Sequence, residues 1–257
     1  MTGKGDFAGL AAVVTGGAAG IGLATARMLV ARGARVAVLD RDVSPLAGDA
    51  DLSVFAADVS DDASVVEAVG GAAALLGGID VLVNNAGIGA TGTVADNDDA
   101  QWHRVFDVNV VGIVRVTRAA LPHLRASHHA AIVNTCSVAA TAGLPQRALY
   151  SASKGAVQSL TLAMAADHVR EGIRVNCVNP GTADTPWVGR LLGNAADADA
   201  ERVALNARQP MGRLVTADEV AFAICSLASP LAASTTGTSL AVDGGMQGLR
   251  LRTAEAR

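Results

Sequence analysis

Short runs rich in β-branched residues alternate along the chain with longer, alanine-rich stretches. The short runs predict seven strands, which are Ala11–Thr15, Arg35–Asp40, Ser53–Ala57, Val81–Asn84, Ala130–Thr135, Arg174–Val178 and Ser239–Val242. The longer stretches predict helices near Ile21–Arg32, Asp62–Leu76, Asp99–Arg125, Leu149–Arg170 and Thr216–Ala228. This alternation is typical of a parallel sheet with helices on both faces. We therefore expect an α/β protein with a doubly wound, Rossmann-like, seven-stranded parallel sheet.

A single domain is expected to span residues 1–257, because α/β folds of this length commonly form one unit. Gly33 and Gly172 stand where helix C-terminal stops belong, and Thr216 with Glu219 predicts a capping box at the last helix. The segment Gly181–Leu214 is rich in Ala, Asp and Arg and has the composition of an insertion. We expect residues 181–214 to form a lid on the substrate side.

The composition adds limits on the core and on the partners. Hydrophobic residues make up 51% of the chain but aromatic residues only 3%, so we expect a core of small aliphatic side chains packed closely around glycines. The formal net charge of −4 argues against a nucleic acid or an anionic membrane as the main partner. A small-molecule substrate is expected instead.

The cysteines and the N-terminus bear on the compartment. Cys136, Cys177 and Cys225 are odd in number and contain no CxxC pair, so neither a disulfide framework nor a zinc site is predicted. The histidines have no useful ligand spacing, and we expect no metal. The N-terminus lacks the apolar stretch of a signal peptide, and no run of about 18 apolar residues occurs. A reducing, cytoplasmic location is expected.

A glycine-rich loop directly follows the first predicted strand, with the sequence Thr15-Gly16-Gly17-Ala18-Ala19-Gly20-Ile21-Gly22. Glycines allow a backbone to approach a pyrophosphate, whose charge is met by amide N–H groups and the helix N-terminus. The second strand ends at Asp40, where a carboxylate can bind ribose hydroxyls and repel a 2′-phosphate. Arg41 could help hold such a phosphate, but we expect Asp40 to dominate. The loop and Asp40 thus predict NAD as the cofactor.

Tyr150 and Lys154 are four residues apart on a predicted helix, so both project from one face. A nearby ammonium favours the phenolate, which allows the hydroxyl to exchange a proton with an alcohol or carbonyl near neutral pH. Ser137 follows the fifth strand, and its hydroxyl can polarise a reacting carbonyl. The pattern predicts Tyr150 as the acid/base of an oxidoreductase, with hydride chemistry supplied by the cofactor.

The glycine spacing, Asn84-Asn85-Ala86-Gly87, Ser137 and the Tyr150–Lys154 pair together resemble the short-chain dehydrogenase/reductase family over nearly the whole chain. The resemblance implies a catalytic tetrad of Asn109, Ser137, Tyr150 and Lys154, with Asn109 supporting a water-mediated proton relay. It also implies a homotetramer. The residues that it and the loop assign to the cofactor are Gly16, Ala19, Gly20, Ile21, Gly22, Asp40, Arg41, Asp58, Val59, Asn85, Ala86, Gly87, Tyr150, Lys154, Pro180, Gly181, Thr182 and Thr185.

The substrate is indicated by charged residues near the tyrosine and in the expected lid. Arg147 lies three residues before Tyr150, and a planar guanidinium is suited to gripping a carboxylate. The stretches Pro180–Trp187 and Arg208–Arg213 resemble the sugar and sugar-acid dehydrogenase subgroup of the family. The substrate-contacting residues expected are Ser137, Arg147, Trp187, Arg190 and Arg208.

Three functions are compatible with these motifs. The first is an NAD-dependent dehydrogenase that interconverts a secondary alcohol and a ketone, or a lactol and a lactone, in a sugar, sugar acid or small hydroxy acid. The second is a 3-oxoacyl-thioester reductase or broad carbonyl reductase, which shares the catalytic motifs. A non-catalytic NAD-binding protein is the third, but it would have no need to keep Ser137, Tyr150 and Lys154 together.

Overall fold

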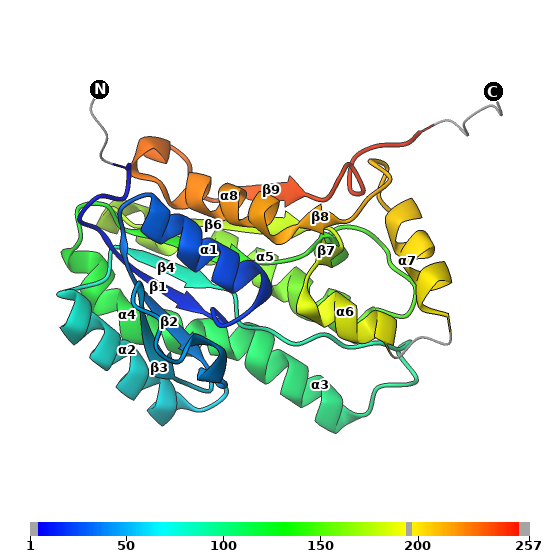
Figure 1. The fold of residues 1–257 in the computed structure, drawn as a ribbon, viewed down its shortest axis with the longest axis horizontal. Helices are drawn as coiled ribbons and strands as arrows, with labels where there is room; N and C mark the ends of the chain where they lie inside the picture. The colour runs from blue at the N-terminus through cyan, green and yellow to red at the C-terminus, as the bar shows by residue number, and fades with distance from the viewer. Residues whose placement is uncertain (1–4, 194–196, 252–257) are drawn as a thin grey trace.

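A computed structural model describes residues 5–193 and 197–251 of the chain. The central sheet has seven strands, all parallel, in the order β3-β2-β1-β4-β5-β6-β9 (Figure 1). The strands are β1 (Ala11–Thr15), β2 (Arg35–Asp40), β3 (Leu52–Ala56), β4 (Val81–Asn84), β5 (Ala131–Thr135), β6 (Arg174–Pro180) and β9 (Ser239–Val242). The predicted fold class and the seven strand positions are confirmed, with ends that shift by one or two residues.

Helices cover both faces of this sheet (Figure 1). The helices are α1 (Gly20–Ala31), α2 (Asp62–Leu76), α3 (Asp99–Phe106), α4 (Gly112–Ala126), α5 (Ala148–His168), α6 (Pro186–Gly193), α7 (Ala198–Ala207) and α8 (Ala217–Ala228). None of the described helices is both long and apolar enough to cross a membrane. The capping box predicted from Thr216 and Glu219 is present at the start of α8.

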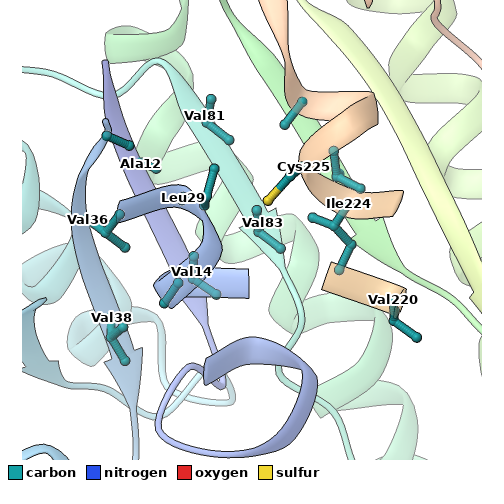
Figure 2. Packing of buried hydrophobic residues seen from close by; sticks show 14 of the residues in the cluster. Ala12, Val14, Leu29, Val36, Val38, Val81, Val83, Val220, Ile224 and Cys225 are labelled. Carbon is teal, nitrogen blue, oxygen red and sulfur yellow. The ribbon is translucent and has the colours of Figure 1, made fainter. Parts of the chain in front are cut away.

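Successive residues of the central strands belong to two different cores, because side chains alternate between the faces of a sheet. Ala12 and Val14 of β1 pack in the core that contains Leu29 of α1 and Ile224 of α8 (Figure 2). Val13, between them, packs in the other core, beneath α2, α4 and α5. The central strands β1, β4 and β5 are therefore buried along their whole length, as expected of a sheet covered on both faces.

The long helix predicted over Asp99–Arg125 is confirmed in extent, but it is not regular. The chain runs without interruption through α3, a π-helical turn over Asp107–Val111, and α4. The π turn contains Asn109, whose side-chain oxygen accepts from the Ile88 N–H at 2.8 Å and whose Nδ2 donates to the Ile88 carbonyl at 2.9 Å. Side-chain bonds of this kind across elements accompany the irregular turn, and no hydrophobic period announces them.

The segment predicted as a lid has its own small framework. Strands β7 (Ala183–Asp184) and β8 (Val215–Thr216) pair in parallel and bring the two ends of the segment together. Between them, α6 and α7 enclose a cluster of Val188, Leu205 and Leu214. Figure 1 shows α6 and α7 beyond the right-hand end of the sheet, towards which β9 points.

Candidate active site

A cavity of about 740 Å³ lies where the carboxyl ends of the strands meet. Its wall takes residues from the ends of six neighbouring strands, including Gly16, Asp40, Asp58, Asn85 and Ser137. The chain order reverses between β1 and β4, since β2 and β3 lie to one side and β5 and β6 to the other. A crevice at such a reversal is the usual ligand site of an open α/β sheet.

The glycine loop leaves the N-terminus of α1 open towards this cavity. Ala19 is the N-cap residue and makes no side-chain cap bond, and the first turn carries no acidic residue. By contrast, α2 and α7 are capped by the carboxylates of Asp61 and Asp197. The free N–H groups of α1 thus suit an anionic ligand.

Two glycines in the loop are required by its geometry. Gly16 has a φ of +61° and Gly20 a φ of +53°, both in the left-handed region that favours glycine. Gly22 does not line the cavity; it faces inwards, where a Cβ would overlap the Gly16 carbonyl oxygen. The loop therefore fits the phosphates of a dinucleotide, with Gly22 holding the loop against the helix.

Acidic and basic groups lie at the far end of the cavity, at the tip of β2. Asp40 accepts from the Ala18 N–H at 3.0 Å, which ties its carboxylate to the glycine loop. The Arg41 guanidinium lies 4.0 Å from the Asp58 carboxylate. A bond from Ser60 and, less strongly, the Arg41 charge lower the pKa of Asp58 from its usual range. The negative charge of Asp40 is thus fixed in the cavity wall, and Arg41 is turned towards Asp58.

Asn85 joins the ends of three strands beneath the cavity. Its Nδ2 donates to the carbonyls of Thr15 and Gly16, at 3.2 and 3.0 Å, and its Oδ1 accepts from the Thr135 hydroxyl at 3.2 Å. The Thr15 hydroxyl in turn accepts from the N–H groups of Asn85 and Ala86. Asn85 both supports the sheet and lines the cavity.

Tyr150 and Lys154 lie together on α5, as the four-residue spacing predicts. The Lys154 ammonium lies 5.8 Å from the centre of the Tyr150 ring. Lys154 is only 5% exposed, and its Nζ donates to the Thr135 carbonyl at 2.8 Å. A charge that is buried and held by a hydrogen bond has a fixed position relative to the tyrosine.

Ser137 and Asn109 complete the surroundings of this pair. Ser137 lines the cavity and caps a short 3₁₀ turn by accepting from the Ala139 N–H at 3.1 Å. Asn109 is fully buried and lies behind the cavity wall. A Cβ added at Gly87 would lie 3.2 Å from Asn109 Oδ1 and 3.6 Å from Lys154 Nζ, so Gly87 separates the two side chains narrowly.

Two arginines line the end of the cavity that is nearest to the lid segment. Arg147 Nη1 donates to the Thr91 hydroxyl at 2.5 Å. Burial lowers the pKa of the Arg147 guanidinium, and repulsion by Arg208 lowers it further. Leu144, Val188 and Leu205 add an apolar surface beside them. This end of the cavity therefore combines positive charge with apolar walls.

Most of the expected site residues come together in this one cavity. The expected substrate residues Trp187 and Arg190 fall outside the residues whose side chains the structure describes. Sequence reasoning missed several wall residues, among them Thr135, Leu144, Val188 and Leu205. These are aliphatic residues and a threonine without a motif of their own, so no local signal marks them as wall residues.

The family is decided by the comparison with known proteins. Residues 16–247 match a family model described as "Enoyl-(Acyl carrier protein) reductase", which is one of the models of the short-chain dehydrogenases/reductases. This chain belongs to the short-chain dehydrogenase/reductase family. As such it is an oxidoreductase that acts on CH–OH groups with a nicotinamide cofactor.

Several dehydrogenases of the family are similar to this chain over almost its whole length. The 2-(S)-hydroxypropyl-CoM dehydrogenase 3 of Xanthobacter autotrophicus is 42% identical, covering 91% of this chain and 94% of its own. The cis-4-hydroxycyclohexanecarboxylate dehydrogenase of Sinomonas cyclohexanicum is 43% identical, covering 93% and 97%. The 2-dehydro-3-deoxy-L-rhamnonate dehydrogenase (NAD(+)) of a Sphingomonas strain is 35% identical, covering 94% and 96%.

A solved structure is similar to the fold of this dehydrogenase. The ligand-free aldohexose dehydrogenase of Thermoplasma acidophilum superposes with a TM-score of 0.90 at 33% identity, covering 98% of this chain and 100% of its own. Together with the relatives, it confirms the recognition made from the motifs.

Proposed function

We propose that this short-chain dehydrogenase uses NAD to oxidise a secondary alcohol in a small hydroxy acid or sugar acid, which it holds by the acid group. The observation that carries the choice of substrate is the pair Arg147 and Arg208 in the wall of the cavity that contains Tyr150. Within the described residues, neither guanidinium has a carboxylate within ion-pair distance.

An anionic group on the substrate relieves the repulsion between these two cations. Arg147 donates through one nitrogen, Nη1, to the carbonyls of Ala90 and Gln146 and to the Thr91 hydroxyl. Its other guanidinium nitrogens remain available, and an arginine binds a carboxylate best through two parallel N–H groups. The apolar side chains of Leu144, Val188 and Leu205 suit the carbon skeleton that links the acid to the alcohol.

The choice of NAD rests on Asp40. Its carboxylate is fixed at the end of β2 by the Ala18 N–H, where it can accept bonds from ribose hydroxyls and repels a 2′-phosphate. One of the similar dehydrogenases carries NAD(+) in its name. With NAD as the cofactor, we expect the oxidative direction.

The proposed roles of Tyr150, Lys154 and Ser137 rest on the positions of their side chains, and the role of Asn109 rests on the family resemblance. NAD, when bound, accepts the hydride from the carbon that carries the hydroxyl. Tyr150 reacts as the phenolate, which the fixed Lys154 ammonium stabilises, and it becomes the neutral phenol when it takes the hydroxyl proton. Ser137 holds the reacting oxygen by its hydroxyl, and Asn109 supports a water-mediated route by which the proton leaves.

Three further assignments belong to this proposal. Residues 1–257 form one catalytic domain, and its segment 181–214 closes over the substrate. Four copies of the chain form a tetramer. The enzyme works in the cytoplasm. The framework of β7, β8, α6 and α7 gives the proposed lid a defined base, since its two ends are paired. Arg208 then links closure of the lid to binding of the acid group.

The test compares an acid with its neutral ester. Reduction of NAD is measured with cis-4-hydroxycyclohexanecarboxylate, with its methyl ester, and with a panel of aldonates, aldoses and small hydroxy acids. We expect acids to have a KM about ten times lower than matched esters, because one charged contact is worth about 1.4 kcal/mol or more. Arg147→Met and Arg208→Met should remove this preference with a small change in kcat.

Activity on uncharged substrates alone would decide against this proposal. Activity restricted to aldoses or neutral alcohols, with both arginine variants unchanged, would contradict the acid-binding proposal. NADP preference together with reduction of 3-oxoacyl thioesters would instead favour the reductase alternative, and the family model's description names an acyl-carrier reductase.

A further inference from the structure

Gln209 is a large polar side chain that is almost fully buried, with 1% of its surface exposed. It follows directly after Arg208, at the end of α7. Burying an amide costs free energy unless its groups are hydrogen-bonded, and an apolar side chain of the same size would avoid this cost. The contacts of this amide are therefore informative.

The Gln209 amide joins two backbone segments. Its Nε2 donates to the Thr182 carbonyl at 3.2 Å and to the Arg213 carbonyl at 2.7 Å. Only the NH₂ end of the amide can face two carbonyl oxygens, so the orientation of the side chain is defined by its partners. One bond spans the four residues of the turn after α7, and the other reaches 27 residues back along the chain.

The distant partner, Thr182, is part of the cavity wall on the cofactor side. Its carbonyl also accepts from the Val215 N–H at 3.1 Å, so two donors hold it. The neighbouring Gly181 packs directly on the amide, and a Cβ there would overlap Gln209 Oε1. Gly181 itself is held by a bond from its N–H to the Val242 carbonyl at 2.9 Å. Movement of the amide would thus move the Gly181–Thr182 wall.

We propose that Gln209 is a positioning residue for the dehydrogenase reaction: its buried amide holds the Gly181–Thr182 wall against the cofactor and, through the chain, keeps Arg208 at a constant distance from that wall. Gln209 touches neither substrate nor cofactor and acts through these two neighbours. The inference concerns the shape of the cavity and holds whether the substrate is an acid or a neutral alcohol.

Gln209→Met tests the proposal, because methionine keeps the length of the side chain and removes both donors. We expect the dissociation constant for NADH, measured by fluorescence titration, to rise about 3- to 10-fold, as for a lost buried hydrogen bond. The kcat with NAD and the best alcohol of the panel should fall about tenfold, because small displacements of a bound reactant slow its reaction. A purely structural role would lower the Tm and leave both quantities unchanged.

Asn206→Ala is the matched control. The Asn206 side chain accepts from the Leu214 N–H at 3.2 Å, so the variant also removes a side-chain-to-backbone bond at the base of the proposed lid. It leaves the Thr182 carbonyl untouched. Its NADH affinity and kcat should equal those of the wild type even if its Tm falls as much as that of Gln209→Met.

Gln209→Glu provides a test if the methionine variant does not fold. A buried carboxyl that faces two carbonyls is favoured in its protonated form, which can donate one of the two bonds. The kcat of this variant relative to the wild type should therefore rise as the pH is lowered from about 8 to about 6. A relative kcat that does not change with pH, or a folded Gln209→Met enzyme with wild-type NADH affinity and kcat, would overturn the proposal.

The two proposals fail in different ways. Loss of the acid preference in the wild-type enzyme would contradict the proposed substrate and leave the Gln209 measurements with NADH unaffected. Wild-type behaviour of Gln209→Met, with acid preference intact, would contradict only the positioning role.

Discussion

At the scale of single residues, Tyr150 carries the proton transfer of the proposed reaction, and its hydroxyl is the group that should matter most. Tyr150→Phe keeps the ring on α5 and removes only the oxygen. We expect kcat to fall about 10²- to 10⁴-fold, the range of a lost general acid or base. NADH binding should be unchanged, because the phenyl ring still fills the cavity wall. Steady-state kinetics and an NADH titration measure both, and retained turnover would contradict the assigned role.

Asp40 should decide which nicotinamide cofactor is used. Asp40→Ser removes the fixed negative charge that repels a 2′-phosphate, while Arg41 keeps its place beside Asp58 at the same end of the cavity. We expect the ratio of kcat/KM for NADP to that for NAD to rise at least about tenfold.

Asp42→Ser is the control for the Asp40 prediction. Asp42 is an exposed carboxylate two residues further on, where it accepts from Ser44, and it does not line the cavity. Asp42→Ser changes the net charge of the protein by the same amount as Asp40→Ser. An equal change of the cofactor ratio in both variants would show that overall charge, and not the position of Asp40, sets the preference.

Contacts between residues close in sequence could be predicted at this site, whereas contacts between residues far apart in sequence could not. Tyr150 and Lys154 are one helical turn apart, so their proximity follows from helix geometry alone. Lys154 is held by the carbonyl of Thr135, and Thr182 by Gln209, across 19 and 27 residues. These partners meet only after the sheet and the lid segment have formed. A backbone carbonyl or a buried glutamine carries no motif that could announce such a contact.

At the scale of elements, the start of α8 depends on an acid that also binds a cation. Glu219 accepts from the Thr216 N–H at 2.8 Å and from Arg213 at 2.6 Å and 2.9 Å. The bonds from Arg213, followed by the Thr216 N–H, lower the pKa of Glu219 from 4.5 to about 2. Its stabilising effect is therefore complete above pH 4.5 and is lost as the pH falls towards 2.

Glu219→Gln should show this pH dependence in the free energy of unfolding. Near neutral pH we expect a loss of about 1 kcal/mol, since the pair is half-exposed and screened by solvent. That corresponds to about 2–4 °C in Tm for a chain of this size. The difference in Tm from the wild type should shrink as the pH is lowered from 4.5 towards 2.

Asp218→Asn supplies the comparison for Glu219. It removes a carboxylate from the same first turn of α8 and leaves the bonds to Arg213 and Thr216 in place. Thermal unfolding followed by circular dichroism at several pH values measures all three proteins. A Tm difference for Glu219→Gln that is constant with pH, or that equals that of Asp218→Asn, would contradict the assigned cause.

The helices illustrate which elements a sequence pattern predicts. The ends of α2 and α8 follow from local signals, an Asp or Thr N-cap and an apolar period, and both were predicted correctly. The π-helical turn between α3 and α4 contains no glycine or proline. It coincides with the two bonds between Asn109 and the Ile88 backbone, which are tertiary contacts. The hydrophobic pattern therefore predicts the helix and its extent, but not the irregular turn inside it.

At the scale of the whole molecule, the sequence predicts a parallel sheet but not the complete order of its strands. Alternation of strands and helices implies a parallel sheet, and the reversal at β1 and β4 places the site. The position of β9 beside β6 rests on long-range pairing of Ser239–Val242 with Cys177–Pro180. The same pairing brings Val242 close to Gly181, whose N–H donates to the Val242 carbonyl. The cofactor-side wall is thus built from segments far apart in sequence.

Apolar side chains on the outer faces of the helices predict that copies of this chain associate. Leu162 on α5 is 51% exposed, although α5 already packs its inner face on the sheet. An exposed leucine on a long helix with small neighbours favours a helix-to-helix contact between copies. We expect a particle of four times the 25.7 kDa of one chain in sedimentation velocity. Leu162→Glu should give smaller particles, because a charge buried in an interface without a partner is strongly unfavourable.

Val66→Glu, which changes a 55% exposed valine on α2, is the control and should leave the tetramer intact. A wild-type protein that sediments as a monomer would contradict the prediction, whereas a tetramer that withstands Leu162→Glu would place the contact on another face.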